Sequence, residues 1–485
     1  MRKLEELKNA GVDVYPYSFD KSDSTIDVLE KYSNVGEEPS QEVVKLAGRV
    51  MNLRRMGKAS FGHIQDGYGK IQFYIRQEDC PEDYKVFKKI DIGDWVGIEG
   101  RVFRTKLGEI TVYVSKLTFL AKSLHPLPEK FHGLQDTELR FRKRYLDLAV
   151  NSEVRDVFVK RAKIIDAVRR FLKNKGFLEV EIPILQPVYG GAEARPFKTH
   201  INAWDMDMYL SISPELYLKR LIVGGFEKVF TICKNFRNED ADKTHNPEFT
   251  MMECYWAYHN YNDMMKLFEE MWEYVAKEVV GSLKVEYGGK EFDFKRPWKR
   301  MSVAAALKEI ADIDIENLDD SQIIDLVEKN GIDYEGELTR GRAILLLFEE
   351  LVEDKLIHPV IIYDYPKEAS PLCKAKRGNP DFIEKFEPYA NGWELGNGYS
   401  ELNDPILQKE AFEEQIERRK KGEKEVHEMD MDFVEALEYG MPPTGGFGLG
   451  IDRMVILLTG VDSLREALLF PTMKPENESS EKAKK

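Results

Sequence analysis

The stretch from residue 224 to residue 258 constrains the fold more than any other part of the sequence. It reads GGFEKVFTICKNFRNEDADKTHNPEFTMMECYWAY, two runs of β-branched and aromatic residues around a polar segment. This pattern predicts two strands joined as an antiparallel hairpin. Because successive side chains of a strand point to opposite faces, one face would display Val229, Thr231, Cys233, Asn235 and Arg237 from the first strand and Phe249, Met251, Glu253 and Tyr255 from the second.

That predicted face combines a guanidinium, an aromatic ring, a carboxylate and a phenol. Arg237 could hold phosphate oxygens through two parallel hydrogen bonds, and Phe249 could stack on a base. The set suits a ligand that contains a phosphate, a flat base and an ammonium group. The alternative is a hairpin whose charged groups are only solvated. Each residue alone fits both interpretations, but the combination favours the ligand site.

Length and composition limit the class of protein. A chain of 485 residues is long enough for at least two domains. A hydrophobic share of 42% and a charged share of 32% are typical of a soluble globular protein. The four cysteines are scattered without metal-ligand spacing, which indicates a reduced cytosolic protein without structural zinc. No signal peptide and no run of 18 apolar residues is present, so we expect neither secretion nor insertion into a membrane.

The net charge of −15 by itself argues against a nucleic-acid partner, but the charges are not distributed evenly along the chain. Residues 45 to 130 contain 16 Lys and Arg but only 10 Asp and Glu. A basic module on an acidic body can orient a polyanion. Chance clustering of the charges is the alternative.

The basic module has the strand rhythm of a small barrel. After a helical and polar extension over residues 1–43, period-two patterns over residues 44–122 predict four to five strands separated by Gly, Asp and Asn turns. This size fits an OB-type barrel, a fold that often binds single-stranded nucleic acid.

Several side chains of the predicted barrel could contact nucleic acid. Phe61, with Phe73 or Tyr74, could stack on bases, and Gln72 could hydrogen-bond to a base edge. Arg54 lies where it could contact phosphates. The aromatic residues could equally fill the core of the barrel.

Beyond the barrel the pattern predicts a second domain of mixed helices and strands. Residues 123–145 form a linker with several prolines, and a helix is expected from Ser152 to about Lys175. Helical spacing dominates residues 263–358, and strands return from Val360. The tail over residues 476–485 is polar and charged, which predicts disorder.

Two carboxylates in the last third of the chain form a candidate metal site. Glu387 and Glu394 flank an Asn391–Gly392 turn, so a hairpin could bring both to one magnesium ion. Acidic pairs at this spacing are also common on solvated surfaces.

Four segments of the sequence resemble a known family. FRNE followed by HNPEFT, and GFGLGIDRM at residues 446–454, resemble the second and third signature motifs of class II aminoacyl-tRNA synthetases. SPELYLKRLIVGGFEKVF at residues 213–230 and GNGYSELNDP at residues 396–405 resemble lysyl-tRNA synthetases in particular. The resemblance extends from about residue 44 to about residue 475.

The resemblance implies an α+β fold and a complete reaction. An N-terminal OB-fold barrel at 44–122 would bind the anticodon, and a class II catalytic domain at 146–475 would have an antiparallel sheet flanked by helices, with a mainly helical insertion at 263–358. The enzyme would activate L-lysine with ATP and transfer it to tRNA(Lys) in the cytoplasm. The helix from Ser152 resembles the first class II motif, which implies a homodimer.

The resemblance also assigns roles to individual residues. Arg237 and Arg453 would be catalytic, with Arg453 holding the γ-phosphate. ATP would be bound by Arg237, Glu239, His245, Asn246, Phe249, Glu387 and Arg453. Lysine would be bound by Gly191, Glu215, Arg237, Glu253, Tyr255, Asn397, Tyr399 and Glu401. Magnesium would be bound by Glu387 and Glu394. The anticodon would be bound by Arg54, Phe61, Gln72 and Glu109.

Glu401 is the residue that most restricts the amino acid. A buried substrate ammonium needs an anion beside it, and Glu401 with Tyr255 meets that need, with Glu253 nearby. A site for aspartate would need a cation there, which argues against a synthetase for aspartate or asparagine. Tyr399 stands where many family members have Phe, so the packing beside Glu401 differs in detail.

Two further alternatives lie outside tRNA charging. A relative that lysylates a protein would lack the barrel. A non-catalytic nucleic-acid-binding protein derived from a synthetase would be expected to have lost at least one of Arg237, Arg453, Glu387 and Glu394, and all four are present.

Overall fold

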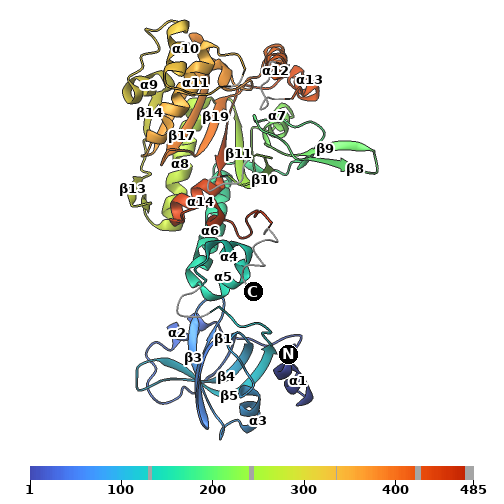
Figure 1. The fold of residues 1–485 in the computed structure, drawn as a ribbon, viewed down its shortest axis with the longest axis vertical. Coiled ribbons are helices and arrows are strands. Elements are labelled where there is room, and N and C mark those ends of the chain that lie inside the picture. The colour runs from blue at the N-terminus through green and yellow to red at the C-terminus, as the bar shows by residue number, and fades with distance from the viewer. Residues whose placement is uncertain (129–133, 240–244, 335, 421–427, 476–485) are drawn as a thin grey trace. The chain divides into compact units, whose positions relative to one another are not determined.

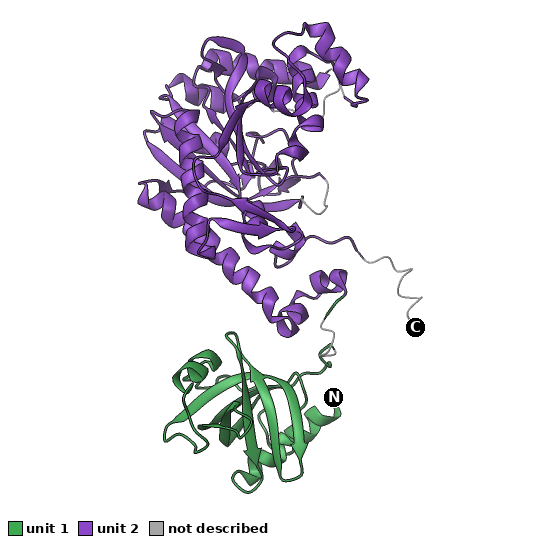
Figure 2. Cartoon of the chain, turned by 90° about the vertical axis from the view of Figure 1, so that its left-hand side faces the viewer, with its two compact units in different colours: residues 1–135 green, residues 136–485 purple. Residues whose placement is uncertain are grey.

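The computed structural model of the chain describes residues 1–128, 134–239, 245–334, 336–420 and 428–475. The chain divides into two compact units, Met1–Gln135 and Asp136–Lys485 (Figure 2). The second unit begins at Asp136, ten residues before the start expected from the sequence, because Thr137–Arg142 (α4) and Arg144–Val150 (α5) are helical. The predicted linker is therefore shorter than 123–145. The predicted tail at 476–485 lies outside the described residues.

The first unit is built on a closed barrel with the strand order β1-β2-β3-β5-β4 (Figure 1). Its strands and the helix between them are β1 (Val43–Met56), β2 (Ala59–Gln65), β3 (Lys70–Arg76), α3 (Pro81–Phe87), β4 (Trp95–Arg104) and β5 (Ile110–Ala121). Burial alternates along β2 and β3, as the period-two pattern predicted. Phe73 is fully buried in the core, so the outward-facing aromatic residue of this pair is Tyr74.

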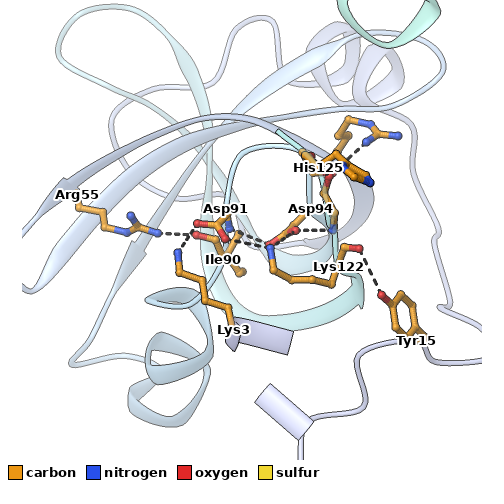
Figure 3. Close-up of polar contacts among 11 residues, drawn as sticks. Lys3, Tyr15, Arg55, Ile90, Asp91, Asp94, Lys122 and His125 are labelled. Atoms are coloured by element: carbon orange, nitrogen blue, oxygen red, sulfur yellow. Dashed lines mark hydrogen bonds and ion pairs between the residues drawn. The ribbon is translucent and has the colours of Figure 1, made fainter. Parts of the chain in front are cut away.

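The N-terminal extension packs onto this barrel. Helices α1 (Arg2–Asn9) and α2 (Thr25–Lys31) contribute Leu7 and Val28 to its hydrophobic core. A partly buried ion-pair network adds to the attachment: Lys122 Nζ lies 2.8 Å from Asp94 Oδ1 and 3.0 Å from Asp91 Oδ2, and the more exposed Lys3 pairs with Asp91 (Figure 3). Residues 1–43 are therefore part of the first unit.

The second unit is organised around one large sheet. The strand order is β14-β15-β17-β19-β20-β11-β10-β6, with β16 and β18 paired to β17. The strands are β6 (Leu178–Glu179), β10 (Lys228–Phe236), β11 (Glu248–Ala257), β14 (Lys299–Ser302), β15 (Val360–Pro366), β16 (Ala375–Lys376), β17 (Asn379–Ala390), β18 (Trp393–Glu394), β19 (Gly396–Ser400) and β20 (Thr444–Gly450). Among the strands of this sheet in the described part of the chain, only the β14–β15 and β10–β6 pairs are parallel. The mixed, mainly antiparallel sheet with helices confirms the predicted α+β class.

Helices cover this sheet through apolar faces. α6 (Ser152–Asn174) and α14 (Ile451–Thr459) share one core with α8 (Tyr261–Val280), which buries Phe268 and Trp272. Further helices of this unit are α7 (Glu215–Val223), α12 (Pro405–Lys420), α13 (Met431–Glu438) and α15 (Leu464–Ala467). β7 (Leu185–Gln186), β8 (Lys198–Ile201) and β9 (Met206–Leu210) form a separate small sheet.

Residues 263–358, expected to form a mainly helical insertion, contribute more to the main sheet and its core than the helical spacing of their apolar residues suggested. Besides α9 (Val303–Ala311), α10 (Asp320–Lys329) and α11 (Arg340–Leu351), this region contains a hairpin of β12 (Lys284–Tyr287) and β13 (Lys290–Asp293). Strand β14 joins the main sheet, and most of α8 lies in the main core. The short strands escaped prediction because four residues are too few to establish a period-two pattern. Among the described helices, none has both the length and the apolar character that crossing a membrane requires.

Candidate active site

The site is built on the hairpin of β10 and β11. In its register Val229 lies opposite Tyr255, Thr231 opposite Glu253, and Asn235 opposite Phe249. Paired residues project to the same face of a sheet, so the face inferred from the sequence is present.

Glycines of the neighbouring strand β20 keep the space above this face open. β20 lies between β11 and β19, with Gly446 paired to both Tyr255 and Tyr399. A Cβ atom at Gly446 would lie 2.5 Å from Glu401 Oε1 and 2.5 Å from the Tyr255 ring, and one at Gly448 would lie 2.7 Å from a methionine methyl group. Since a real Cβ atom cannot lie this close to the Tyr255 ring, Gly446 forms a floor that only glycine permits, whereas at Gly448 the methionine side chain would have to move. The sequence indicated the motif but not this use of it.

One cavity, of about 170 Å³, is lined by all eight residues proposed for the amino acid: Gly191, Glu215, Arg237, Glu253, Tyr255, Asn397, Tyr399 and Glu401. They come from four separate parts of the chain: the segment before β8, α7, the β10–β11 hairpin, and β19 with the residue that follows it. Gly191 has a φ of 85°, and a Cβ atom there would lie 2.8 Å from Ser213 Oγ. Its backbone therefore approaches the cavity as closely as a glycine allows.

Carboxylates dominate the polar groups of this cavity. Glu253 accepts hydrogen bonds from Ser213 Oγ at 2.9 Å and from the Tyr255 hydroxyl at 3.0 Å. Burial raises the pKa of Glu253 to about 8, and burial likewise raises the pKa of Glu401 to about 8. A cationic ligand would offset the cost of ionising these buried groups.

A second cavity, of about 270 Å³, is lined by six of the seven residues proposed for ATP: Arg237, Glu239, His245, Asn246, Phe249 and Arg453. Arg237 and Asn397 line both cavities, so the two adjoin. The Arg237 guanidinium lies over the Phe249 ring, with Cζ 5.1 Å from its centroid. Its buried Nε has no hydrogen-bond partner among the described residues, which leaves a donor for a ligand. Arg453 donates a hydrogen bond to the Glu394 carbonyl.

The two proposed magnesium ligands differ in their surroundings. A tight turn at Asn391 and Gly392, both with positive φ, joins β17 to β18, and Glu394 lines the second cavity. Glu387 is not among the described residues that line either cavity. It is buried, lies 2.8 Å from Lys385 Nζ and accepts a hydrogen bond of 2.7 Å from the Tyr389 hydroxyl.

The donor set is compatible with magnesium only if the nucleotide contributes. No group of three or more His, Cys, Asp or Glu side chains suitable for a metal occurs in the described part of the chain. Mg²⁺ is commonly held by one or two carboxylates together with substrate phosphates and water. Glu394, in the wall of the second cavity, fits that pattern beside a bound ATP, whereas both oxygens of Glu387 are engaged by Lys385 and Tyr389.

The proposed anticodon residues gather on one face of the barrel. Phe61 on β2 pairs across the sheet with Arg54 on β1, and its ring centroid lies 4.5 Å from that of Tyr74. Gln72 Nε2 donates a hydrogen bond of 2.5 Å to Glu109. The sequence had not singled out His63, which contacts the other Glu109 oxygen at 2.7 Å, although the alternation of β2 places it on the same face as Phe61.

Comparison with known proteins defines the class. Residues 136–474 match the model of the family "tRNA synthetases class II (D, K and N)", and residues 44–120 match that of the "OB-fold nucleic acid binding domain". The chain therefore belongs to the class II tRNA synthetases, ATP-dependent ligases that join an amino acid to tRNA.

Similar proteins within the class are named as lysine–tRNA ligases. Lysine–tRNA ligase 2 of Methanosarcina mazei is 50% identical, covering 98% of this chain and 94% of that protein. Lysine–tRNA ligase of Carboxydothermus hydrogenoformans is 50% identical over 98% of this chain and 97% of its own length. Lysine–tRNA ligase of Clostridium novyi is 51% identical, covering 98% of this chain and 94% of that protein.

Proposed function

We propose that the protein is a lysine–tRNA ligase of the cytoplasm. It activates L-lysine with ATP, forming lysyl-adenylate and pyrophosphate, and then transfers the lysyl group to the 3′ end of tRNA(Lys). The observation that carries the proposal is the pair of adjoining cavities: one is rich in carboxylates, and the other is lined by an arginine over an aromatic ring. Identity of 50–51% to lysine–tRNA ligases over nearly the whole chain supports it.

The first cavity fits a ligand with two ammonium groups. Glu401 and Tyr255 hold the side-chain ammonium of lysine, with Glu253 beside them. Glu215 and the Gly191 backbone hold the α-amino group, and Asn397 and Tyr399 complete the wall. The carboxylates at both positions offset the desolvation of two cations, which is the recognition problem that lysine presents.

The second cavity fits ATP. Phe249 stacks on the adenine, and Glu239, His245 and Asn246 surround the adenosine. Arg237, at the junction of the cavities, pairs with the lysine carboxylate or the α-phosphate, and Arg453 pairs with the γ-phosphate. Glu387 and Glu394 would hold Mg²⁺, which would neutralise phosphate charge.

Positioning accounts for the chemistry of the first step. The lysine carboxylate is already ionised at neutral pH and needs no general base. It attacks the α-phosphorus, and pyrophosphate leaves. Arg237 can hold the two reacting groups near each other because it lines both cavities. Phosphoryl-type transfer depends mainly on such alignment and on charge neutralisation.

The barrel recognises the anticodon through four residues: Arg54, Phe61, Gln72 and Glu109.

The active enzyme is a homodimer in which α6 and the segment after it contribute to the interface. Exposed apolar side chains there support this assignment, among them Val159 at 52%, Leu178 at 47% and Leu185 at 45% exposure.

The decisive experiment is exchange of labelled pyrophosphate into ATP without tRNA, run against all twenty amino acids. We expect exchange with lysine alone. Exchange with another amino acid would retain the family and refute the assignment of the pocket. Failure to exchange with any amino acid would refute the proposed activity.

Lysine binding is expected to strengthen as the pH rises from 6.5 to 8. Glu253, whose pKa burial raises to about 8, holds a proton at the lower pH and cannot pair with an ammonium. The side-chain ammonium of lysine, with an unperturbed pKa of about 10.4, stays charged throughout this range. Calorimetry in two buffers of different ionisation enthalpy measures both the affinity and the protons released. A dissociation constant independent of pH, without proton release, would contradict this electrostatic account.

Replacing Phe61 with alanine is expected to raise the KM for tRNA about tenfold, because stacking on a base contributes roughly 1–3 kcal/mol. Lysine-dependent pyrophosphate exchange should stay within twofold of the parent, since the barrel takes no part in activation. Tyr68→Ala is the matched control: this aromatic residue, 71% exposed, lies in a turn of the same barrel outside the proposed anticodon face. Equal loss of charging and exchange in Phe61→Ala would show that the barrel has no separate role.

A further inference from the structure

Lys219 is a buried cation that the sequence analysis did not single out. It lies on α7, one helical turn after Glu215, and its side chain has no exposed surface. Its Nζ atom lies 2.5 Å from Glu215 Oε1 and 2.5 Å from Glu401 Oε2. Although burial alone would lower it, the two carboxylates raise the pKa of Lys219, so this side chain is an ammonium.

Lys219 lies behind the amino-acid cavity. Glu215 and Glu401 line that cavity, whereas Lys219 is not among the described residues of its wall. The second oxygen of Glu401, Oε1, is buried without a hydrogen-bond partner in the described structure and points toward Gly446 on the cavity floor. Lys219 thus engages one oxygen of Glu401 and leaves the other available to a ligand.

Neighbouring groups restrict Lys219 to this position. The Tyr255 ring centroid lies 6.0 Å from Nζ, and the third carboxylate of the cavity, Glu253, is occupied by Ser213 and Tyr255. An unpaired buried ammonium is costly, so Lys219 cannot leave one carboxylate without losing stabilisation. The same contacts restrict the movement of Glu215 and Glu401.

We propose that Lys219 is a positioning residue for amino-acid selection, which holds Glu215 and Glu401 at a fixed separation. The inference rests on the proposed function: the two carboxylates receive the α-amino group and the side-chain ammonium of lysine. With both carboxylates fixed, a diamino acid one methylene shorter, ornithine, cannot reach both partners. Without Lys219 the separation of the two carboxylates is no longer fixed, so the site selects less strongly against the shorter ligand.

The test is Lys219→Met, which keeps most of the length of the side chain and removes its charge. We expect the KM for lysine in pyrophosphate exchange to rise at least 30-fold, kcat to fall less than threefold, and the preference for lysine over ornithine in kcat/KM to fall at least tenfold. Lys219→Arg keeps the charge and should restore part of the preference. Lys234→Met, at a lysine 40% exposed on β10, is the matched control and should match the parent.

Each outcome decides between the alternatives. A lysine KM and a lysine-to-ornithine preference within twofold of the parent would overturn the proposal. Equal losses of lysine affinity, kcat and ATP affinity would also overturn it, because that pattern indicates that Lys219 has only a structural role. If Lys219→Met does not fold, as judged by thermal unfolding, Lys219→Arg decides: a preference lowered at least threefold supports the proposal, and a smaller change overturns it. Absence of lysine exchange in the parent would instead refute the proposed function itself.

Discussion

Replacing Arg237 with alanine is expected to reduce lysine-dependent pyrophosphate exchange by about 10²- to 10³-fold, the range observed when a preorganised electrostatic donor is removed from an active site. Arg237 lines both cavities, and its buried Nε has no partner among the described residues. Because it faces both the carboxylate and the phosphate in the proposed complex, kcat should fall more than either KM rises. Initial rates at varied lysine and ATP concentrations separate these effects.

A matched control lies on the same hairpin. Lys234 on β10 is 40% exposed and pairs with Glu248 at 3.2 Å, away from the cavities. Lys234→Ala removes a cation from the same strand and should leave exchange within twofold of the parent. Arg237→Lys should restore only part of the rate, because an ammonium cannot reproduce the planar pair of donors. An Arg237→Ala variant with a nearly normal rate would remove Arg237 from the mechanism.

Glu401→Gln is expected to weaken lysine binding by about 100-fold or more. Glutamine has almost the same shape as glutamate but no charge, and loss of one partner from a buried ion pair costs roughly 3–5 kcal/mol. The effect should appear in the KM for lysine, while the affinity for ATP stays near that of the parent, because Glu401 does not belong to the described wall of the second cavity. Calorimetric titration with lysine and with ATP measures the two affinities separately.

Folding must be checked in this variant, because Glu401 also neutralises Lys219. Glu215 remains 2.5 Å from that ammonium, so we expect the variant to fold with a lowered melting temperature. Glu248→Gln, at an exposed carboxylate of the same hairpin, serves as the control for the loss of one negative charge. Lysine affinity unchanged by Glu401→Gln would place the side-chain ammonium elsewhere in the cavity.

Local sequence patterns were sufficient to predict the strand faces. Alternation along β10 and β11 predicts which side chains share a face, since the period of a strand is independent of the rest of the chain. The same rule on β2 and β3 left one choice open, Phe73 or Tyr74 as the stacking partner of Phe61. Closure of the barrel decided it: the face toward the core takes Phe73, and Tyr74 remains outside.

The surroundings of the carboxylates were not accessible from sequence. The turn at Asn391 and Gly392 predicted that Glu387 and Glu394 would lie near each other in a hairpin. It did not predict that the Glu387 carboxylate would form an ion pair with Lys385 and accept a hydrogen bond from Tyr389. Side chains at i−2 and i+2 of a strand share its face, so this contact could have been inferred. Whether the face is buried depends on the strands and helices packed against it.

The sequence by itself determined the class of the protein, the faces of its main strands and the identity of nearly all the proposed site residues, because motifs and strand alternation are local properties. Only the tertiary structure showed two adjoining cavities above a glycine floor and the buried cation behind one of them. Lys219 and Glu401 are far apart in the chain, and Lys219 reads as an ordinary surface lysine on an amphipathic helix. Burial is a property of the packed whole, and it gives that lysine a role in the site.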